Sequence, residues 1–276
     1  MPHVVANGIR TFYRSAGEGP PLLLIAGNGM EHTTFDEQLP SFARHFRCIV
    51  YDLRGIGASD VPADGYTTAG MARDARGLLD ALGIEQAHVA GYSLGGAIAQ
   101  ELVLAEPRRV LSLSLYASYD RPQPYMRLRY DILVDITLHC SPRLWAMYSA
   151  FSAFGAEYID AHEQAVRDEI DKRIARWESG SAPDRHGLAG HYRAILSHDT
   201  LDRLQAIRCP TWIAVGSSDA VTPPAHSRRM HEAIAGSELR IYPGKPHRLL
   251  NFEAAAFNRD ALEFLLRHRS GQASAH

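Results

Sequence analysis

Short apolar runs and turn residues alternate through the first 120 residues of the chain. Ile9–Ser15 alternates apolar and polar positions, as a strand with one buried face does. Leu22–Ile25 and Cys48–Tyr51 are continuously apolar, which is the pattern of strands buried on both faces. We predict a short helix at Phe35–His45, between these two runs. The pattern therefore predicts buried strands joined by connections that carry helices.

The most regular helical pattern covers Met71–Leu82, where apolar residues recur every three or four positions on one stripe. Gly83 follows at the position of a C-terminal cap. The next predicted elements are a strand, a helix and a strand, at Ala87–Tyr92, Leu94–Ala105 and Val110–Ala117. Elements in this order predict an α/β fold, with a mostly parallel central sheet and helices on both of its faces.

The pattern changes after Asp120. Residues 121–203 show helical periodicity, are rich in aromatic, Met and His residues, and contain no convincing strand pattern. We therefore predict one core, made of residues 1–120 and 204–270, with a helical cap subdomain inserted at 121–203. Residues 271–276 are small and polar, and we expect them to form a disordered tail.

Strand and helix patterns resume after the predicted cap. Strands are predicted at Trp212–Gly216 and Leu239–Tyr242, and a closing helix carries apolar residues at helical spacing over Phe257–Leu265. Between the two strands, Thr222 is the expected N-cap of a further helix, with Pro223 at its first position. These elements complete the predicted core.

Charge and cysteine content exclude several classes of protein. The 29 basic and 31 acidic residues are interspersed, so no basic patch indicates a nucleic-acid or membrane partner. No stretch approaches the roughly 20 apolar residues that span a bilayer, and the N-terminus lacks a signal-peptide pattern. Cys48, Cys140 and Cys209 are odd in number and far apart, which fits a reducing compartment. We expect a cytoplasmic monomer or homodimer.

The segment with the clearest chemistry is Gly91-Tyr92-Ser93-Leu94-Gly95-Gly96, between a predicted strand and a predicted helix. A Ser on such a sharp turn projects its hydroxyl above the carboxyl edge of a parallel sheet. The strained turn requires small flanking residues, which Gly91 and Gly95 provide. A GxSxG pentapeptide alone is also compatible with a glycine-rich turn that has no chemistry. Its position between strand and helix favours Ser93 as a nucleophile.

A serine nucleophile requires a base, and the base requires an acid that orients it. His247 is the candidate base, because among 14 His it alone follows a late core strand in a Gly/Pro-rich loop. Asp219, just after the strand Trp212–Gly216, is the favoured acid. Asp120, just after the strand Val110–Ala117, is the alternative acid.

An acyl-transfer site also requires backbone N–H groups that bind the oxyanion. Leu94, directly after Ser93, is one candidate donor, and Asn28 in the glycine-rich loop after Leu22–Ile25 is the other. The expected substrate-contacting residues lie beside these elements: Gly27, Tyr92, Ser118 and Tyr119.

Several segments in a fixed order resemble the α/β-hydrolase superfamily. They are the serine motif, the D-x-R-G-x-G-x-S segment of Asp52–Ser59, the segment Asp219–Pro224, and Pro243-Gly244-Lys245-Pro246-His247. Within the superfamily the chain is most similar to 3-oxoadipate enol-lactonases, aminoacrylate/carbamate-type hydrolases and meta-cleavage-product hydrolases. Those proteins often carry His-Gly in the oxyanion loop, where this chain has Ala26-Gly27. The resemblance implies the α/β-hydrolase fold and the residue order Ser, acid, His.

The sequence thus predicts a serine hydrolase that cleaves an ester or lactone of a small hydrophobic or cyclic metabolite through an acyl-enzyme. Three alternatives stay open: hydrolysis of a carbon–carbon bond in a vinylogous diketone, a cofactor-independent dioxygenase of this fold in which the Ser is not a nucleophile, and a ligand sensor of the same fold. The expected partner is a small-molecule substrate, and neither a metal nor a cofactor is expected. Arg127 and Arg129 at the cap entrance are candidates for binding a substrate carboxylate.

Overall fold

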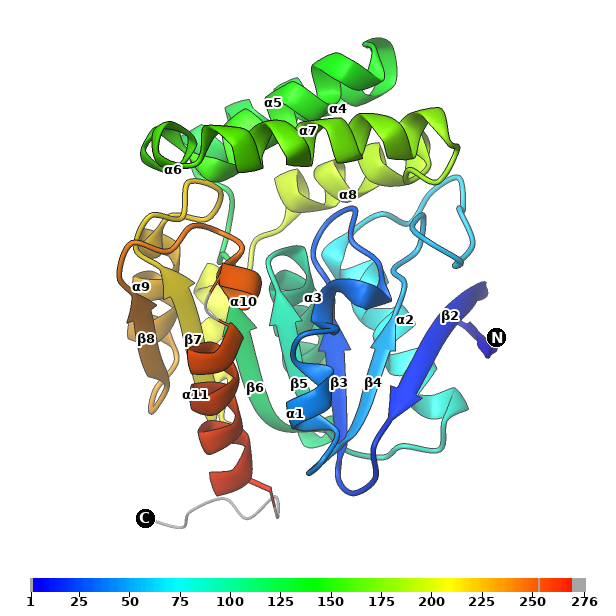
Figure 1. Ribbon diagram of the computed structural model, residues 1–276. Coiled ribbons are helices and arrows are strands. Elements are labelled where there is room, and N and C mark those ends of the chain that lie inside the picture. Colours follow the sequence, from blue (N-terminus) through cyan, green and yellow to red (C-terminus); the bar gives the residue numbers. More distant parts are fainter. Residues whose placement is uncertain (1, 253, 270–276) are drawn as a thin grey trace.

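The computed structural model describes residues 2–252 and 254–269 (Figure 1). The described residues form an eight-stranded sheet in the order β1-β2-β4-β3-β5-β6-β7-β8. β1 and β2 are antiparallel to their neighbours, and β4, β3, β5, β6, β7 and β8 are parallel to one another. The strands are β1 His3–Ala6, β2 Ile9–Ala16, β3 Pro21–Ile25, β4 Arg47–Tyr51, β5 Ala87–Tyr92, β6 Val110–Tyr116, β7 Thr211–Gly216 and β8 Glu238–Tyr242.

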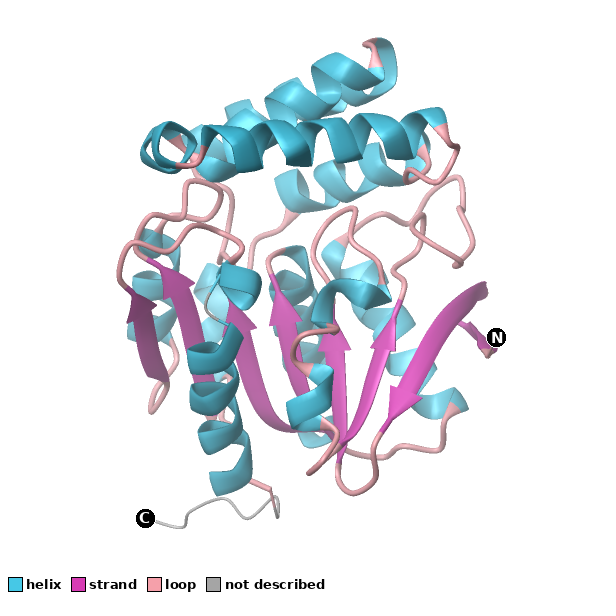
Figure 2. Ribbon diagram, in the orientation of Figure 1, coloured by secondary structure: helices cyan, strands magenta, loops and turns pink. Residues whose placement is uncertain are grey.

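The central strands are buried on both faces, as their continuous apolar runs predict. Successive side chains of β3 enter opposite cores: Leu23 and Ile25 pack on one side of the sheet, and Leu22 and Leu24 on the other. On the first side lie α2 Thr68–Ala81, α3 Leu94–Ala105 and α9 Pro224–Ala233 (Figure 2). On the second lie α1 Leu39–Phe42, α10 Leu249–Phe252 and α11 Ala254–Arg267. The predicted fold class is confirmed.

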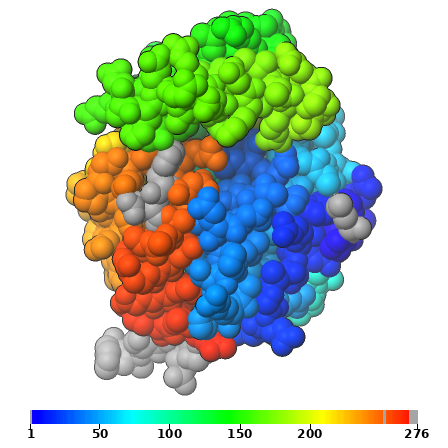
Figure 3. Space-filling model, viewed as in Figure 1, coloured from blue at the N-terminus to red at the C-terminus, as the bar shows by residue number. Residues whose placement is uncertain are grey.

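Five helices lie between β6 and β7, across the carboxyl ends of the parallel strands (Figures 1 and 3). We call α4–α8 the cap helices. Their bounds, with those of the short 3₁₀ helices, are α4 Pro124–His139, α5 Pro142–Phe154, α6 Ala156–Ala161, α7 Glu163–Glu178, α8 Arg185–Ser197, η1 His32–Phe35, η2 Pro107–Arg109 and η3 Leu201–Ala206. No strand occurs among residues 121–203, all of which are described. No helix in 2–252 or 254–269 is long and apolar enough to cross a membrane.

Two local predictions are wrong. The single helix predicted at Phe35–His45 is divided into η1 and α1, because Pro40 fits only in the first turn of a helix and α1 therefore begins at Leu39. Thr222 does not cap α9: that helix begins at Pro224 and has Pro223 at its N-cap position. The predicted disordered tail at 271–276 lies outside the described residues.

Candidate active site

Ser93 occupies a sharp turn between β5 and α3, at the carboxyl edge of the sheet. Its backbone has φ 55° and ψ −117°, a conformation that is strained for a residue with a side chain. Its N–H donates to the carbonyl of Tyr116 in the neighbouring strand, at 2.8 Å. The strained turn is thus held by β6 on one side and by the start of α3 on the other.

The glycines around Ser93 are required by close backbone contacts. A Cβ on Gly91 would lie 2.2 Å from the carbonyl oxygen of Gly95. A Cβ on Gly95 would lie 2.1 Å from the carbonyl oxygen of Ile25 in β3. Both separations are far below van der Waals contact, so only glycine allows α3 to start so close to the sheet.

The hydroxyl of Ser93 is buried but available. The residue is 1% exposed, and among the described residues its Oγ has no hydrogen-bond partner. A buried hydroxyl without a partner is costly, so the free Oγ indicates a functional position. It lies at the amino end of α3, where the helix dipole favours developing negative charge.

His247 and Asp219 form a buried pair beside Ser93. His247 Nδ1 lies 2.8 Å from Asp219 Oδ2. The other carboxylate oxygen, Asp219 Oδ1, accepts hydrogen bonds from the N–H groups of Val221 and Thr222, both at 2.8 Å. The Thr222 hydroxyl lies 2.9 Å from Asp219 Oδ2 and 2.9 Å from the carbonyl oxygen of Ala117. Asp219 is therefore fixed in position before any substrate binds.

Asp120 belongs to a separate cluster. Its carboxylate accepts from Arg229 Nε at 2.7 Å and Arg229 Nη2 at 2.8 Å, and lies 2.6 Å from His226 Nδ1. Burial acts to raise the pKa of Asp120, but hydrogen bonds from His226 and Arg229 outweigh burial and hold that pKa well below its ordinary value. The structure therefore pairs Asp219, not Asp120, with His247.

The glycine-rich loop after β3 lies directly against Ser93. A Cβ on Gly27 would be 3.4 Å from Ser93 Cβ. The N–H groups of Asn28 and Leu94 have no hydrogen-bond acceptor among the described residues. His191 in α8 fixes the loop, because the N–H of Gly29 donates to its Nδ1 at 3.3 Å. The two candidate oxyanion donors thus lie on adjacent backbone segments, and their N–H groups are free to bind a substrate oxygen.

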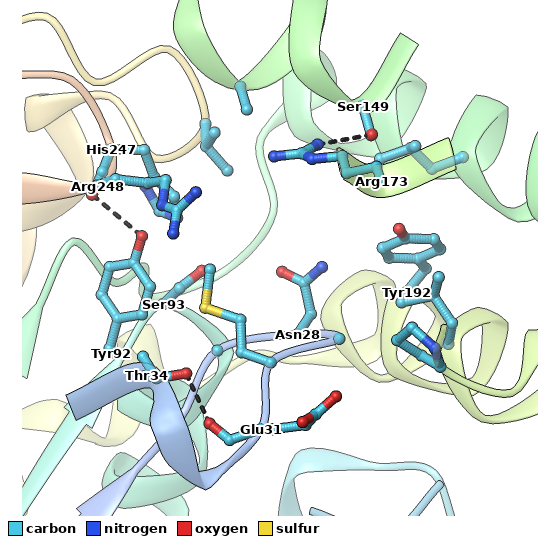
Figure 4. Close-up of a pocket in the computed structure, with 18 of the residues that line it drawn as sticks. Asn28, Glu31, Thr34, Tyr92, Ser93, Ser149, Arg173, Tyr192, His247 and Arg248 are labelled. Atoms are coloured by element: carbon cyan, nitrogen blue, oxygen red, sulfur yellow. Dashed lines mark hydrogen bonds between the residues drawn. The ribbon is translucent and has the colours of Figure 1, made fainter. Parts of the chain in front are cut away.

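A cavity of about 420 Å³ connects these groups to the cap helices (Figure 4). Its floor includes Ser93, His247 and Asn28, and its roof comes from α4, α5, α7 and α8. The apolar part of the lining combines aromatic and aliphatic side chains: Met30, Tyr92, Tyr130, Leu133, Trp145, Ala153, Pro183, Leu188, Tyr192 and Val221. This volume suits a small molecule.

Of the four predicted substrate-contacting residues, Gly27 and Tyr92 line the cavity and Ser118 and Tyr119 do not. Ser118 is fully buried and donates from Oγ to the carbonyl of Ser93 at 2.9 Å. Tyr119 is fully buried and packs edge-on against His198. Ser118 therefore supports the turn that carries Ser93, and neither residue lines the cavity.

Most of the charged side chains that line the cavity were not predicted from the sequence. Arg129 was a candidate and lines the cavity, but Arg173, Arg248 and Glu169 were not singled out. Glu169 Oε1 accepts from Arg173 Nε at 3.0 Å and from Arg248 Nη1 at 3.2 Å. Two signals were present in the sequence: Arg248 directly follows His247, and Arg173 lies four residues after Glu169 on a helix.

Residues 20–254 match the model of the alpha/beta hydrolase fold family. The chain belongs to this family, and the resemblance inferred from its motifs is confirmed. The protein of Variovorax paradoxus named "Putative carbamate hydrolase RutD" is 33% identical over 253 residues, which cover 91% of this chain and 93% of the relative.

Two solved structures extend the similarity. A hydrolase from Pseudomonas aeruginosa PA01 superposes with a TM-score of 0.84 at 31% identity, over 96% of this chain and 97% of that one. The enol-lactonase from Burkholderia xenovorans LB400 gives a TM-score of 0.85 at 25% identity, over 96% of this chain and 100% of that one. The protein is thus an α/β-hydrolase, of the family that includes carbamate hydrolase and enol-lactonase relatives.

Proposed function

We propose that this α/β-hydrolase is a serine hydrolase that cleaves an ester or lactone of a small metabolite through an acyl-enzyme. The observation that carries the proposal is the free, buried Oγ of Ser93 in the same cavity as His247, whose Nδ1 is occupied by Asp219. A proton on Nδ1 leaves Nε2 as the basic nitrogen. The enol-lactonase relative supports a lactone as one substrate type.

In the first step, His247 Nε2 takes the proton of Ser93 Oγ as Oγ attacks the substrate carbonyl carbon. The negative charge that develops on the carbonyl oxygen is bound by the N–H groups of Asn28 and Leu94, and Asp219 stabilises the imidazolium. The bond to the leaving oxygen then breaks, and His247 returns the proton to that alcohol or enol.

In the second step, His247 takes a proton from water, and the resulting hydroxide attacks the acyl carbon. The ester bond to Ser93 breaks, the serine regains a proton from His247, and the carboxylic acid leaves. When the substrate is a lactone, the leaving hydroxyl remains attached to the acyl chain. The product is then a single hydroxy or oxo acid.

The proposal is tested by turnover of a panel containing p-nitrophenyl butyrate, a δ-lactone and a vinylogous diketone. For Ser93→Ala we expect kcat to fall about 1,000-fold or more, because the residual rate comes from binding and the oxyanion site alone. Ser179→Ala, an exposed serine of the cap, is the matched control. Turnover confined to the diketone would favour carbon–carbon hydrolysis, and ligand binding without turnover on any member would favour the sensor.

A further inference from the structure

Arg129 is a buried cation that has no carboxylate partner among the described residues. It lies on α4, is 7% exposed and lines the same cavity as Ser93. Its Nε is buried with no hydrogen-bond partner, and no Asp or Glu of the described residues lies within ion-pair distance. Its guanidinium carbon stands 4.8 Å from the ring centroid of Tyr130. This contact is attractive but does not neutralise the charge.

An unpaired buried charge destabilises a protein, so buried Arg residues are almost always paired. The guanidinium cannot lose its proton in a protein and stays charged. An unpaired Arg beside a substrate cavity is explained if an anionic ligand enters the cavity and pairs with it, because the ion pair then offsets the destabilisation.

The charged side chains near Arg129 also favour an anionic ligand in the cavity. Arg173 and Arg248 share the single carboxylate of Glu169, and Arg173 Nη1 also donates to Ser149 Oγ at 2.7 Å. Figure 4 shows Arg173 reaching in from the cap and Arg248 from the loop of His247, on opposite sides of the space above Ser93. With Arg129, these described side chains place three positive charges against one negative charge. Lys172, Arg176 and Glu31 also line the cavity, where Arg176 and Glu31 pair with each other and Lys172 is exposed.

We propose that Arg129 is a specificity-determining residue that binds a carboxylate of the substrate, so that the enzyme acts on small anionic esters or lactones. This inference rests on the proposed function and names its substrate class. The planar guanidinium binds a carboxylate through two parallel hydrogen bonds, which positions the substrate as well as attracting it. The uncharged, aromatic part of the cavity holds the carbon skeleton between this carboxylate and Ser93.

Matched esters test the inference. Mono-p-nitrophenyl glutarate and p-nitrophenyl pentanoate have the same acyl length, and differ at the far end as carboxylate and methyl. 4-(Butyryloxy)benzoate and p-tolyl butyrate place the same difference on the leaving group. For Arg129→Gln we expect kcat/KM to fall about 10- to 100-fold for the anionic ester of at least one pair, and to change about twofold or less for its neutral partner.

Arg127→Gln is the matched control, because Arg127 is exposed on the same helix and has no part in the cavity. Arg129→Lys keeps the charge and should retain more of the anionic preference than Arg129→Gln. Circular dichroism establishes that each variant is folded. Equal losses on the anionic and neutral esters of both pairs would overturn the inference.

Equilibrium binding separates this inference from the proposed function. Calorimetry with glutarate should show binding to the wild type and to Ser93→Ala, and at least tenfold weaker binding to Arg129→Gln. If no ester is hydrolysed but glutarate binding depends on Arg129, the catalytic proposal fails and the anion site stands. If esters are hydrolysed but glutarate binds Arg129→Gln as it binds the wild type, the anion site is wrong.

Discussion

Asp219 and Asp120 show how two carboxylates at neighbouring strand ends acquire different roles. Both follow a core strand, and both are buried. One carboxylate oxygen of Asp219 accepts hydrogen bonds from two backbone N–H groups, and the other lies against His247. Asp120 is fully occupied by Arg229 and His226. The difference lies in the partners: Asp219 is held by N–H groups of its own loop and by His247, whereas Asp120 is held by two side chains of α9.

This difference leads to a testable pair of variants. Asp219→Asn should lower kcat about 1,000- to 10,000-fold with little loss of stability, because an amide favours the wrong tautomer of His247. Asp120→Asn should lower the thermal midpoint, because it weakens a buried bidentate ion pair, and should leave kcat close to wild type. Parallel ester kinetics and thermal unfolding check both expectations. The reverse pattern would assign Asp120 as the acid.

The catalytic candidates were predictable at the scale of residues because each follows a recognisable local signal. Ser93 and Asp219 come just after the buried strands β5 and β7, and His247 follows the edge strand β8. Parallel strands present their carboxyl ends at one edge of the sheet. Ser118 and Tyr119 also follow a strand, yet they turn away from the cavity. Position after a strand predicts the edge of the sheet, but the direction of the side chain depends on the local turn.

At the scale of elements, the contact between α3 and β3 determines where Ser93 stands. Gly95 is the point of closest approach, since any Cβ there would meet backbone carbonyls of both Ile25 and Ala26, at 2.1 and 2.6 Å. Backbone atoms inside a sheet move little. A side chain at this position must therefore displace the start of α3, and Ser93 with it.

Gly95→Ala should consequently reduce the free energy of unfolding by about 3 kcal/mol and also reduce ester hydrolysis. Gly180→Ala is the control: its φ is +71° but a Cβ there meets nothing within 4 Å, so it should cost only about 1 kcal/mol and leave kcat unchanged. Urea titration and ester kinetics measure both effects. Equal stability of the two variants would show that the close contact between Gly95 and the backbone of Ile25 does not require glycine.

The helix with a long regular apolar pattern was predicted correctly, whereas the helix start that was predicted from one capping residue was not. The helix predicted at Met71–Leu82 corresponds to α2, with Gly83 beyond its end at φ +66°. Thr222 has the chemistry of an N-cap, but its hydroxyl is held by Asp219 and Ala117. The Thr222 hydroxyl therefore makes these hydrogen bonds instead of capping the helix. The local sequence pattern does not predict hydrogen bonds of this kind.

At the scale of the whole molecule, three buried His residues are held neutral. Burial is the main cause that lowers the pKa of His88 to about 4, of His191 to about 4 and of His198 to about 3. In the unfolded chain, with ordinary pKa values near 6.5, these three groups therefore bind more protons than in the folded chain between about pH 6.5 and pH 3. Their contribution to stability is complete above this window and is lost as the pH falls through it.

His191→Gln should therefore flatten the dependence of stability on pH. We expect the slope of the free energy of unfolding between about pH 6 and pH 4.5 to be smaller than in the wild type by about 1 kcal/mol per pH unit. His186→Gln, an exposed site on the same helix, is the control. Urea titrations across this range give the slopes. An unchanged slope in His191→Gln would mean that His191 is not held neutral.

The charge of the cavity could not be predicted from the sequence, because the charged residues that line it come from separate segments. Arg129 lies on α4, Glu169 and Arg173 lie on α7, and Arg248 follows the last strand. Their meeting depends on how the cap helices pack over the sheet. The chain as a whole is nearly neutral, with a formal net charge of −2, so the surplus of positive charge is a property of the assembled cavity.

The most direct test of the proposed function is the site of covalent labelling by a fluorophosphonate, identified by peptide mass spectrometry. An activated serine is expected to give one adduct, on the peptide containing Ser93. The adduct should disappear in Ser93→Ala and form much more slowly in His247→Gln. Labelling that persists in Ser93→Ala, or an unlabelled Ser93 in active wild-type enzyme, would contradict the assignment of Ser93 as the nucleophile.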